Sequence, residues 1–158
     1  MSLYEIADGT RLLTTDPAKL DLRMVHHVLT RSYWSPGIAF HTVQRGVEHS
    51  IPFGVLENGQ HVAFARVISD RTTFAYLADV FVLEEFRGRG IGSWMMAGIL
   101  AHPELRGLRT WLLATRDAHR LYGKHGFVPL PNPDRWMRFP AEPDHESARR
   151  IAAEVEAD

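Results

Sequence analysis

Residues 79–92 read DVFVLEEFRGRGIG, the most informative stretch of this 158-residue sequence. The stretch opens with an apolar run typical of a buried strand and passes into a glycine-rich turn. The apolar segment Ile91 to Leu100 follows, with residues spaced for one helix face. A strand, a glycine turn and a helix start in this order gather free backbone N–H groups at the positive end of a helix dipole. The stretch therefore predicts an anion site that suits phosphate.

The spacing of the glycines narrows the choice of ligand. Gly88, Gly90 and Gly92 let the backbone approach a ligand without an intervening Cβ, and Arg87 and Arg89 add positive charge. No Lys-Ser/Thr pair follows, which argues against a P-loop nucleotidase. The pattern also differs from the dinucleotide fingerprint G-x-G-x-x-G, and no acidic residue closes a downstream strand. A pyrophosphate-bearing cofactor is the ligand that we predict; a plain structural turn is the alternative.

Composition and charge set the frame for this site. The length fits one domain over residues 1–140, and residues 141–158 form a polar C-terminal tail. A formal charge of −1, with 18 basic and 19 acidic residues, argues against a nucleic-acid binder. The absence of cysteine excludes disulfides, a thiol nucleophile and cysteine-ligated zinc. The start of the sequence lacks the layout of a signal peptide, and no apolar run suits a membrane span. We expect a soluble cytoplasmic protein that binds neither nucleic acid nor membrane.

The order of elements along the chain predicts an α+β fold. An Asp16-Pro17 pair marks a helix start, and Asn58-Gly59 marks a tight hairpin turn. The predicted strands are 12–15, 53–56, 62–68, 72–83, 111–115, 127–130 and 136–139. The predicted helices are 17–31, 38–49, the one that follows Gly92, and 118–125.

Two motifs in this order resemble the GNAT superfamily of acyl-CoA-dependent N-acyltransferases. Residues 87–92, RGRGIG, fit that family's [RQ]-x-x-G-x-[GA] pyrophosphate loop. Residues 118–127, AHRLYGKHGF, resemble its A-x-x-x-Y-x-x-x-G-F segment. The resemblance implies a mixed, mostly antiparallel sheet of six to seven strands flanked by helices and splayed between strands four and five.

The resemblance also implies where the co-substrate acetyl-CoA binds. Backbone groups of Val80, Phe81 and Val82 would pair with the pantetheine arm as an added strand does. The amides of Gly88, Arg89, Gly90, Ile91, Gly92 and Ser93 would hold the pyrophosphate, with Arg87 beside them. Thr115 stands where many members have an asparagine that binds the pantetheine amide, and its hydroxyl is a weaker substitute.

For the chemistry, the resemblance implies direct attack of a neutral amine on the thioester. Tyr122 is the predicted proton donor to the departing thiolate, since a phenol with a pKa near ~10 stays protonated at neutral pH. Asp79 is the best acidic candidate for the general base; a histidine or a water chain is the alternative. Ala78 replaces the glutamate of polyamine-type members, so Asp79 either takes a proton or anchors a cationic acceptor.

Fewer features of the sequence indicate where the amine acceptor binds. Tyr33 and Trp34, next to a Pro-Gly turn, are predicted to line the acceptor cleft, and burial of these rings under a loop is the alternative. The nine histidines lack metal-ligand spacing, so no metal is expected. A homodimer is expected from the resemblance alone.

The resulting hypothesis is an N-acetyltransferase that moves an acetyl group from acetyl-CoA to a primary amine of a small molecule or peptide. The alternative is a non-catalytic acyl-CoA-binding sensor or interaction module.

Overall fold

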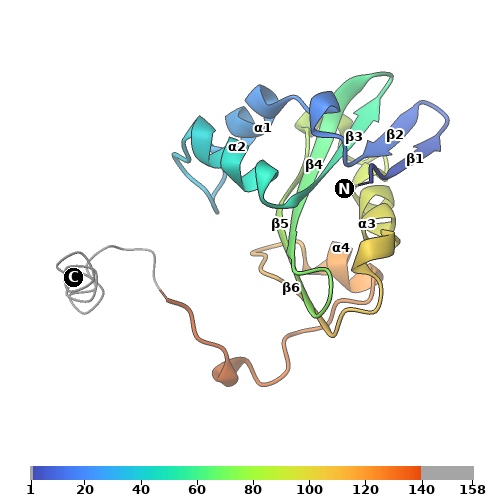
Figure 1. The fold of residues 1–158 in the computed structure, drawn as a ribbon. Helices are drawn as coiled ribbons and strands as arrows, with labels where there is room; N and C mark the ends of the chain where they lie inside the picture. Colours follow the sequence, from blue (N-terminus) through green and yellow to red (C-terminus); the bar gives the residue numbers. More distant parts are fainter. Residues whose placement is uncertain (1, 140–158) are drawn as a thin grey trace, which may run out of the picture. The chain divides into compact units, whose positions relative to one another are not determined.

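The structure is a computed structural model that describes residues 2–139. Contacts divide the chain into two units, residues 1–127 and 128–158, and each is described by itself. The first unit carries one six-stranded sheet in the order β1-β2-β3-β4-β5-β6 (Figure 1). Its strands are β1 (Glu5–Asp8), β2 (Arg11–Thr14), β3 (Ile51–Glu57), β4 (Gln60–Ser69), β5 (Phe74–Val82) and β6 (Thr110–Leu113).

The sheet is antiparallel except at its last pair. β1 to β5 pair with their neighbours in antiparallel fashion, and β6 runs parallel to β5. The predicted hairpin at Asn58-Gly59 is confirmed, and both residues have positive φ. Strand β1 was missed in the sequence. Its signal was the Asp8-Gly9 pair, because Gly9 at φ +59° turns the chain into β2.

Helices cover both faces of the sheet. α1 (Leu22–Leu29) and α2 (Phe40–Glu48) lie on one face, and α3 (Ile91–Leu100) with α4 (His119–Lys124) lies on the other (Figure 1). Two apolar cores result. α1 and α2 pack on Phe64 and Phe81, whereas Met95, Met96 and Ile99 of α3 join the larger core of the opposite face.

The first predicted helix starts later than expected. Asp16 and Pro17 do start a helical turn, but this turn is a short 3-10 helix, Pro17–Lys19, and Leu20 after it is extended. The α-helix begins only at Leu22, where the Asp21 side chain accepts a hydrogen bond from the Met24 amide. The two aspartate caps, Asp16 and Asp21, therefore divide the predicted helix 17–31 into two.

The predicted strands 127–130 and 136–139 are absent from the structure, where both segments are irregular. Pro129, Pro131 and Pro133 lie in this part of the chain and cannot donate a ladder hydrogen bond, which opposes strand pairing. The only regular element described beyond Phe127 in residues 128–139 is the 3-10 turn Pro133–Arg135. The predicted tail, 141–158, lies outside the described residues.

Candidate active site

β5 and β6 separate halfway along β5. β6 pairs only with Phe74 to Leu77, whereas β5 continues to Val82. A pocket of about 460 Å³ opens at this point, lined by both strands and by the chain that follows β6. The predicted splay is therefore confirmed, between the strands labelled β5 and β6 because the N-terminal hairpin adds one strand to the count.

A β-bulge at Asp79 accompanies the separation. Phe64 pairs with Phe81 and Arg66 with Ala78, so one extra residue lies on β5. Asp79 takes up that residue in the left-handed conformation, at φ +57°. This conformation is uncommon for a residue with a side chain and is found chiefly where the surrounding structure fixes it. The bulge turns the Asp79 carboxylate into the pocket.

Residues Val80 to Val82 follow the bulge with β4 on one side only. Such a strand presents the backbone groups of alternate residues on its open side, where an extended ligand can pair with them. One of these groups is occupied: the Val82 carbonyl accepts a hydrogen bond from Arg87 Nε at 3.0 Å. Arg87 thus fixes the end of β5 relative to the glycine turn.

The glycine turn leads directly into α3. Gly88 and Gly90 both have φ +76°, and Gly90 is the N-cap residue of the helix without a side-chain cap. Among the described residues, no acceptor is bound by any main-chain amide from Gly88 to Ser93. A Cβ placed at either glycine would meet no protein atom within 4 Å. These amides therefore face open space at the N-terminus of α3, a fitting site for a phosphate group.

Arg89 and Arg11 stabilise the back of this turn. The Arg89 guanidinium lies 5.1 Å from the centre of the Phe86 ring, and the Arg89 carbonyl accepts a hydrogen bond from Arg11 at 2.9 Å. Arg11 also forms an ion pair with Glu57. This contact of Arg11 with the turn could not be predicted from the sequence, because it depends on how β2 lies beside α3.

Tyr122 lies on α4 and lines the same pocket as Asp79. Its ring is buried in the core and meets Phe127 edge-on, with 6.0 Å between ring centres. Burial, followed by the proximity of Tyr33 and Asp117, raises the pKa of Tyr122 to about 12. Its hydroxyl forms no hydrogen bond within residues 2–139. Tyr122 is thus a protonated phenol with a free donor at the pocket.

Thr115 lies at the pocket with its hydroxyl already engaged. Thr115 Oγ1 accepts a hydrogen bond from the Ala118 amide at 3.0 Å, which caps the approach to α4. Asp117 does not cap α4 and forms an exposed ion pair with Arg116. The Thr115 hydroxyl can still donate one hydrogen bond to a ligand carbonyl.

The loop between α1 and α2 contacts both sides of the pocket, β5 on one side and the chain after β6 on the other. Trp34 Nε1 donates to Asp79 Oδ1 at 3.1 Å, and the Tyr33 hydroxyl accepts from the Arg116 amide at 3.0 Å. The Arg116 guanidinium stacks 3.9 Å from the centre of the Tyr33 ring. Both aromatic residues line the pocket, and both remain partly exposed. The structure therefore brings Tyr33 and Trp34 together with Asp79 and Tyr122.

Arg66 was missed in the sequence and is the main partner of Asp79. Its Nε donates to Asp79 Oδ2 at 2.9 Å, and this side of the carboxylate is largely buried. A signal was available, since a charged residue inside the apolar run of β4 needs a buried partner of opposite charge. The partner could not be read from the sequence, because the pairing depends on the bulge. For metals, the described residues contain no group of three or more suitable ligands.

Comparison with known proteins agrees with this geometry. The sequence model of the acetyltransferase (GNAT) domain matches residues 48–129, which is more than half of the 158 residues. A crystal structure of a candidate GNAT acetyltransferase from Xanthomonas campestris pv. campestris superposes with a TM-score of 0.82 at 45% identity, over 85% of this chain and 96% of that one. A candidate acetyltransferase of Gibberella zeae is 29% identical over 74% of this chain and 78% of its own length.

More distant structures share the fold. The ribosomal-protein-S18-alanine N-acetyltransferase of Escherichia coli has a TM-score of 0.63 at 22% identity, over 77% of this chain and 79% of that one. These matches confirm the mixed, mostly antiparallel sheet and the predicted resemblance. The chain belongs to the GNAT acetyltransferase family. The roles of the individual site residues stay predictions. Separately, none of the helices within residues 2–139 has the length and apolar character that crossing a membrane would require.

Proposed function

We propose that this protein transfers an acetyl group from acetyl-CoA to a primary amine. Family membership supports acetyl transfer, and the open pocket shared by Asp79 and Tyr122 supports direct attack by an acceptor that enters beside these residues. The single observation that carries the proposal is the protonated, unpaired Tyr122 hydroxyl in that pocket. A sensor that only binds acyl-CoA has no need of a proton donor there.

The residues at hand fit the coenzyme. The unpaired amides from Gly88 to Ser93 would bind its pyrophosphate, and the open side of β5 at Val80 to Val82 would pair with its pantetheine arm. The Thr115 hydroxyl would donate to a pantetheine carbonyl. A structural relative from Clostridium acetobutylicum, described as a crystal structure with acetyl-CoA, shares the fold at 18% identity and a TM-score of 0.59, over 91% of this chain and 98% of that one. Bound acetyl-CoA supplies an acetyl group on a thioester.

The reaction then needs one proton donated and one removed. The nitrogen of the neutral amine forms a bond to the acetyl carbon, and the bond between this carbon and sulfur breaks. The Tyr122 hydroxyl gives its proton to the sulfur, which leaves as a thiol. The nitrogen loses one proton, which returns to Tyr122 through solvent, so the products are the N-acetylated amine and free coenzyme A. The enzyme is unchanged after each cycle.

Asp79 is the residue that we propose to orient the amine. One oxygen of its carboxylate accepts from Trp34 and the other from Arg66, and each oxygen keeps a further lone pair for an N–H of the acceptor. Both oxygens are held in place by donors from the protein, which suits Asp79 to the orientation of an acceptor. Water at the open pocket then takes the amine proton.

The test is thiol release after mixing of the protein with acetyl-CoA and a panel of primary amines. Release that depends on an amine, together with the N-acetylated product in a mass spectrum, is the expected result. Binding of acetyl-CoA without thiol across the panel would contradict the enzyme and support the sensor. A homodimer stays a prediction that sedimentation of the same sample can test.

A further inference from the structure

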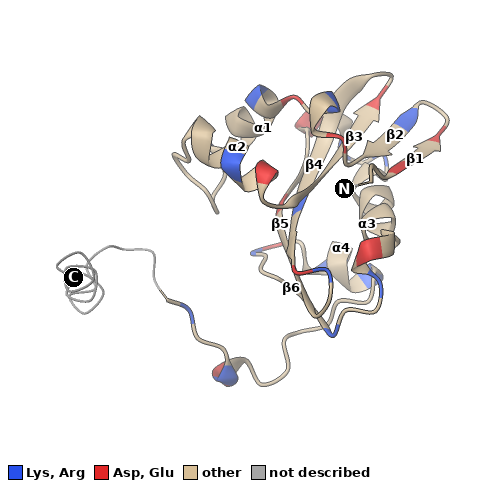
Figure 2. Ribbon diagram, in the orientation of Figure 1, with Lys and Arg blue, Asp and Glu red and all other residues tan. Residues whose placement is uncertain are grey.

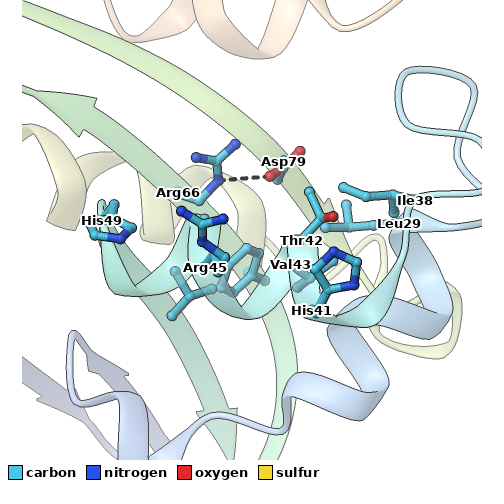
Figure 3. A pocket seen from close by; sticks show the side chains of 12 residues that line it. Leu29, Ile38, His41, Thr42, Val43, Arg45, His49, Arg66 and Asp79 are labelled. Atoms are coloured by element: carbon cyan, nitrogen blue, oxygen red, sulfur yellow. Dashed lines mark hydrogen bonds and ion pairs between the residues drawn. The ribbon is translucent and has the colours of Figure 1, made fainter. Parts of the chain in front are cut away.

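A second pocket, of about 430 Å³, lies between α2 and β4 (Figure 3). Its apolar floor is part of the core under α1 and α2, formed by Leu29, Val43, Val47 and Phe64. Arg66 and Asp79 line this pocket and also the pocket between β5 and β6, which we call the transfer pocket. An acceptor that occupies the second pocket can therefore extend past this ion pair toward Tyr122.

The Arg66 guanidinium is fixed at the boundary of the two pockets. Besides its bond to Asp79, Arg66 Nη1 donates at 3.0 Å to Ser50 Oγ, and Ser50 in turn donates to the Gly46 carbonyl of α2. A Cβ at Gly46 would lie 3.6 Å from the guanidinium, at an ordinary van der Waals distance, so the Arg66 side chain lies directly against α2. Within residues 2–139, the remaining N–H donors of Arg66 have no partner.

Arg45 brings a second positive charge to the same pocket. It lies on α2, and Figure 3 draws its guanidinium on the same side of the pocket as that of Arg66. In the described part of the chain, Arg45 forms neither a hydrogen bond through its side chain nor an ion pair. Asp79 is the only acidic residue among the described residues that line the pocket, so two arginines face one carboxylate.

The excess of positive charge is local. The chain as a whole has a formal charge of −1, and Figure 2 shows acidic and basic segments interspersed over the ribbon. Two guanidinium groups that line one pocket repel each other, and a bound anion relieves this repulsion. Arginine is also the side chain best suited to bind a carboxylate through two parallel hydrogen bonds. The net charge of this arginine–aspartate set matches a ligand group with one negative charge.

We propose that this pocket binds a carboxylate of the acceptor, so that the substrate is a primary amine that also carries a carboxylate. The inference rests on the proposed acetyl transfer and names its substrate class. Arg45 and the free donors of Arg66 bind the carboxylate, while Asp79 receives the amine at the boundary of the transfer pocket. A polyamine would instead bring a second ammonium group against the two arginines, which disfavours that class.

The test compares acceptors that differ only in charge. Glycine, β-alanine, γ-aminobutyrate and δ-aminovalerate are each assayed against the corresponding carboxamide, at saturating acetyl-CoA, with rates expressed per free amine. For at least one chain length, kcat/KM is expected to be about 10- to 100-fold higher for the carboxylate, the range of a hydrogen bond to a charged group. The Arg45→Gln variant should lower this ratio to the part that the free donors of Arg66 still supply, and Arg45→Lys should retain more of the preference.

Arg109→Gln is the matched control. Arg109 lines neither pocket, and its side chain forms no hydrogen bond or ion pair within the described residues. Its loss should leave the carboxylate preference unchanged. Ratios of one or less for every chain length, with thiol still released, would overturn the carboxylate proposal and leave acetyl transfer intact.

If no amine causes thiol release from acetyl-CoA, the proposed function is wrong. Direct binding measurements then test whether the second pocket binds a carboxylate. The four amino acids are then titrated by calorimetry into the full-length protein saturated with coenzyme A. Saturable binding that weakens about 10-fold or more in Arg45→Gln supports the carboxylate site. Absence of binding to the unmodified protein, for all four compounds, overturns it.

Discussion

Trp34 donates its indole N–H to Asp79 across 3.1 Å, and this bond joins the loop between α1 and α2 to the bulge of β5. The two residues are 45 positions apart. Tyr33, the neighbour of Trp34, reaches in the other direction and accepts from the Arg116 amide. The loop is therefore attached to β5 and to the chain that follows β6, on the two sides of the transfer pocket. Its position fixes the orientation of the Asp79 carboxylate and one wall of the acceptor path.

Replacement of Trp34 by Phe tests this attachment. The ring remains, but the N–H that orients Asp79 is lost, so we expect KM for the amine to rise about 3- to 10-fold, the value of one hydrogen bond. KM for acetyl-CoA should not change. Steady-state kinetics with each substrate varied in turn gives both constants. Tyr33→Phe removes the hydrogen bond to the Arg116 amide and is the companion variant. If either variant changes the KM for the amine and the KM for acetyl-CoA equally, the loop supports the whole fold and not Asp79 in particular.

Tyr122→Phe tests the proton donor. We expect kcat to fall about 100- to 10,000-fold, the usual contribution of acid–base catalysis. Because burial raises the pKa of Tyr122 to about 12, the phenol stays protonated throughout the working range. The activity of the unmodified enzyme should therefore show no alkaline decline caused by this group below about pH 10. Pre-steady-state thiol release measures the chemical step; an unchanged rate for that step in the variant removes Tyr122 from the mechanism.

Gly90→Ala tests the anion site through a matched pair of glycines. Gly90 and Gly107 have nearly the same φ, +76° and +75°, and a Cβ at either would meet no protein atom within 4 Å. An alanine at either position costs about 1–2 kcal/mol of backbone strain. Only the Gly90 variant places a methyl group beside the amides of the turn, so only that variant should bind coenzyme A more weakly. Calorimetric titration of both variants gives the comparison; equal affinities would place the pyrophosphate elsewhere.

The sequence predicted the parts of the site that follow from local rules. The turn from β5 into α3 depends on the glycines at 88 and 90, and the position of Tyr122 depends on the helix that follows β6. Both are short-range features that residue type and spacing specify. The family pattern then supplied the splay of the sheet, which no local rule contains.

The residues that the sequence did not predict depend on long-range register. Arg66 meets Asp79 because one extra residue on β5 shifts the pairing with β4, and a bulge of this kind leaves no clear pattern in the sequence. The position of Arg45 at the second pocket depends on how α2 packs on the sheet, which the sequence does not specify. The prediction of two C-terminal strands was wrong for a local reason. The apolar pattern indicated strand pairing, but three prolines in this part of the chain oppose it.

His61 should make the stability of the fold depend on pH. Its ring is buried between α1 and the sheet; Nδ1 accepts from the Asp21 amide at 3.0 Å, and Nε2 donates to the Ala63 carbonyl at 2.8 Å. The first bond requires the neutral ring, because a protonated Nδ1 cannot accept a hydrogen bond. Burial, partly offset by the Ala63 carbonyl and by Asp21, lowers the pKa of His61 below its usual value near ~6.5.

The sign follows from proton binding. Between the lowered pKa of the folded state and about pH 6.5, the unfolded chain binds a proton at His61 that the folded chain does not. The free energy of unfolding is therefore highest above about pH 6.5 and falls as the pH falls through this window, by at most about 1.4 kcal/mol per pH unit for one proton. The lowered pKa of the buried His102 adds a slope of the same sign.

Urea unfolding between pH 8 and pH 5 measures this slope. His61→Gln keeps a donor and an acceptor but cannot titrate, so the difference in stability between the unmodified protein and this variant should shrink as the pH falls. His119→Gln, at an exposed position of α4, is the control, and its stability should run parallel to that of the unmodified protein. A His61→Gln curve that also runs parallel would mean that the ring accepts a proton in the folded state as readily as in the unfolded chain.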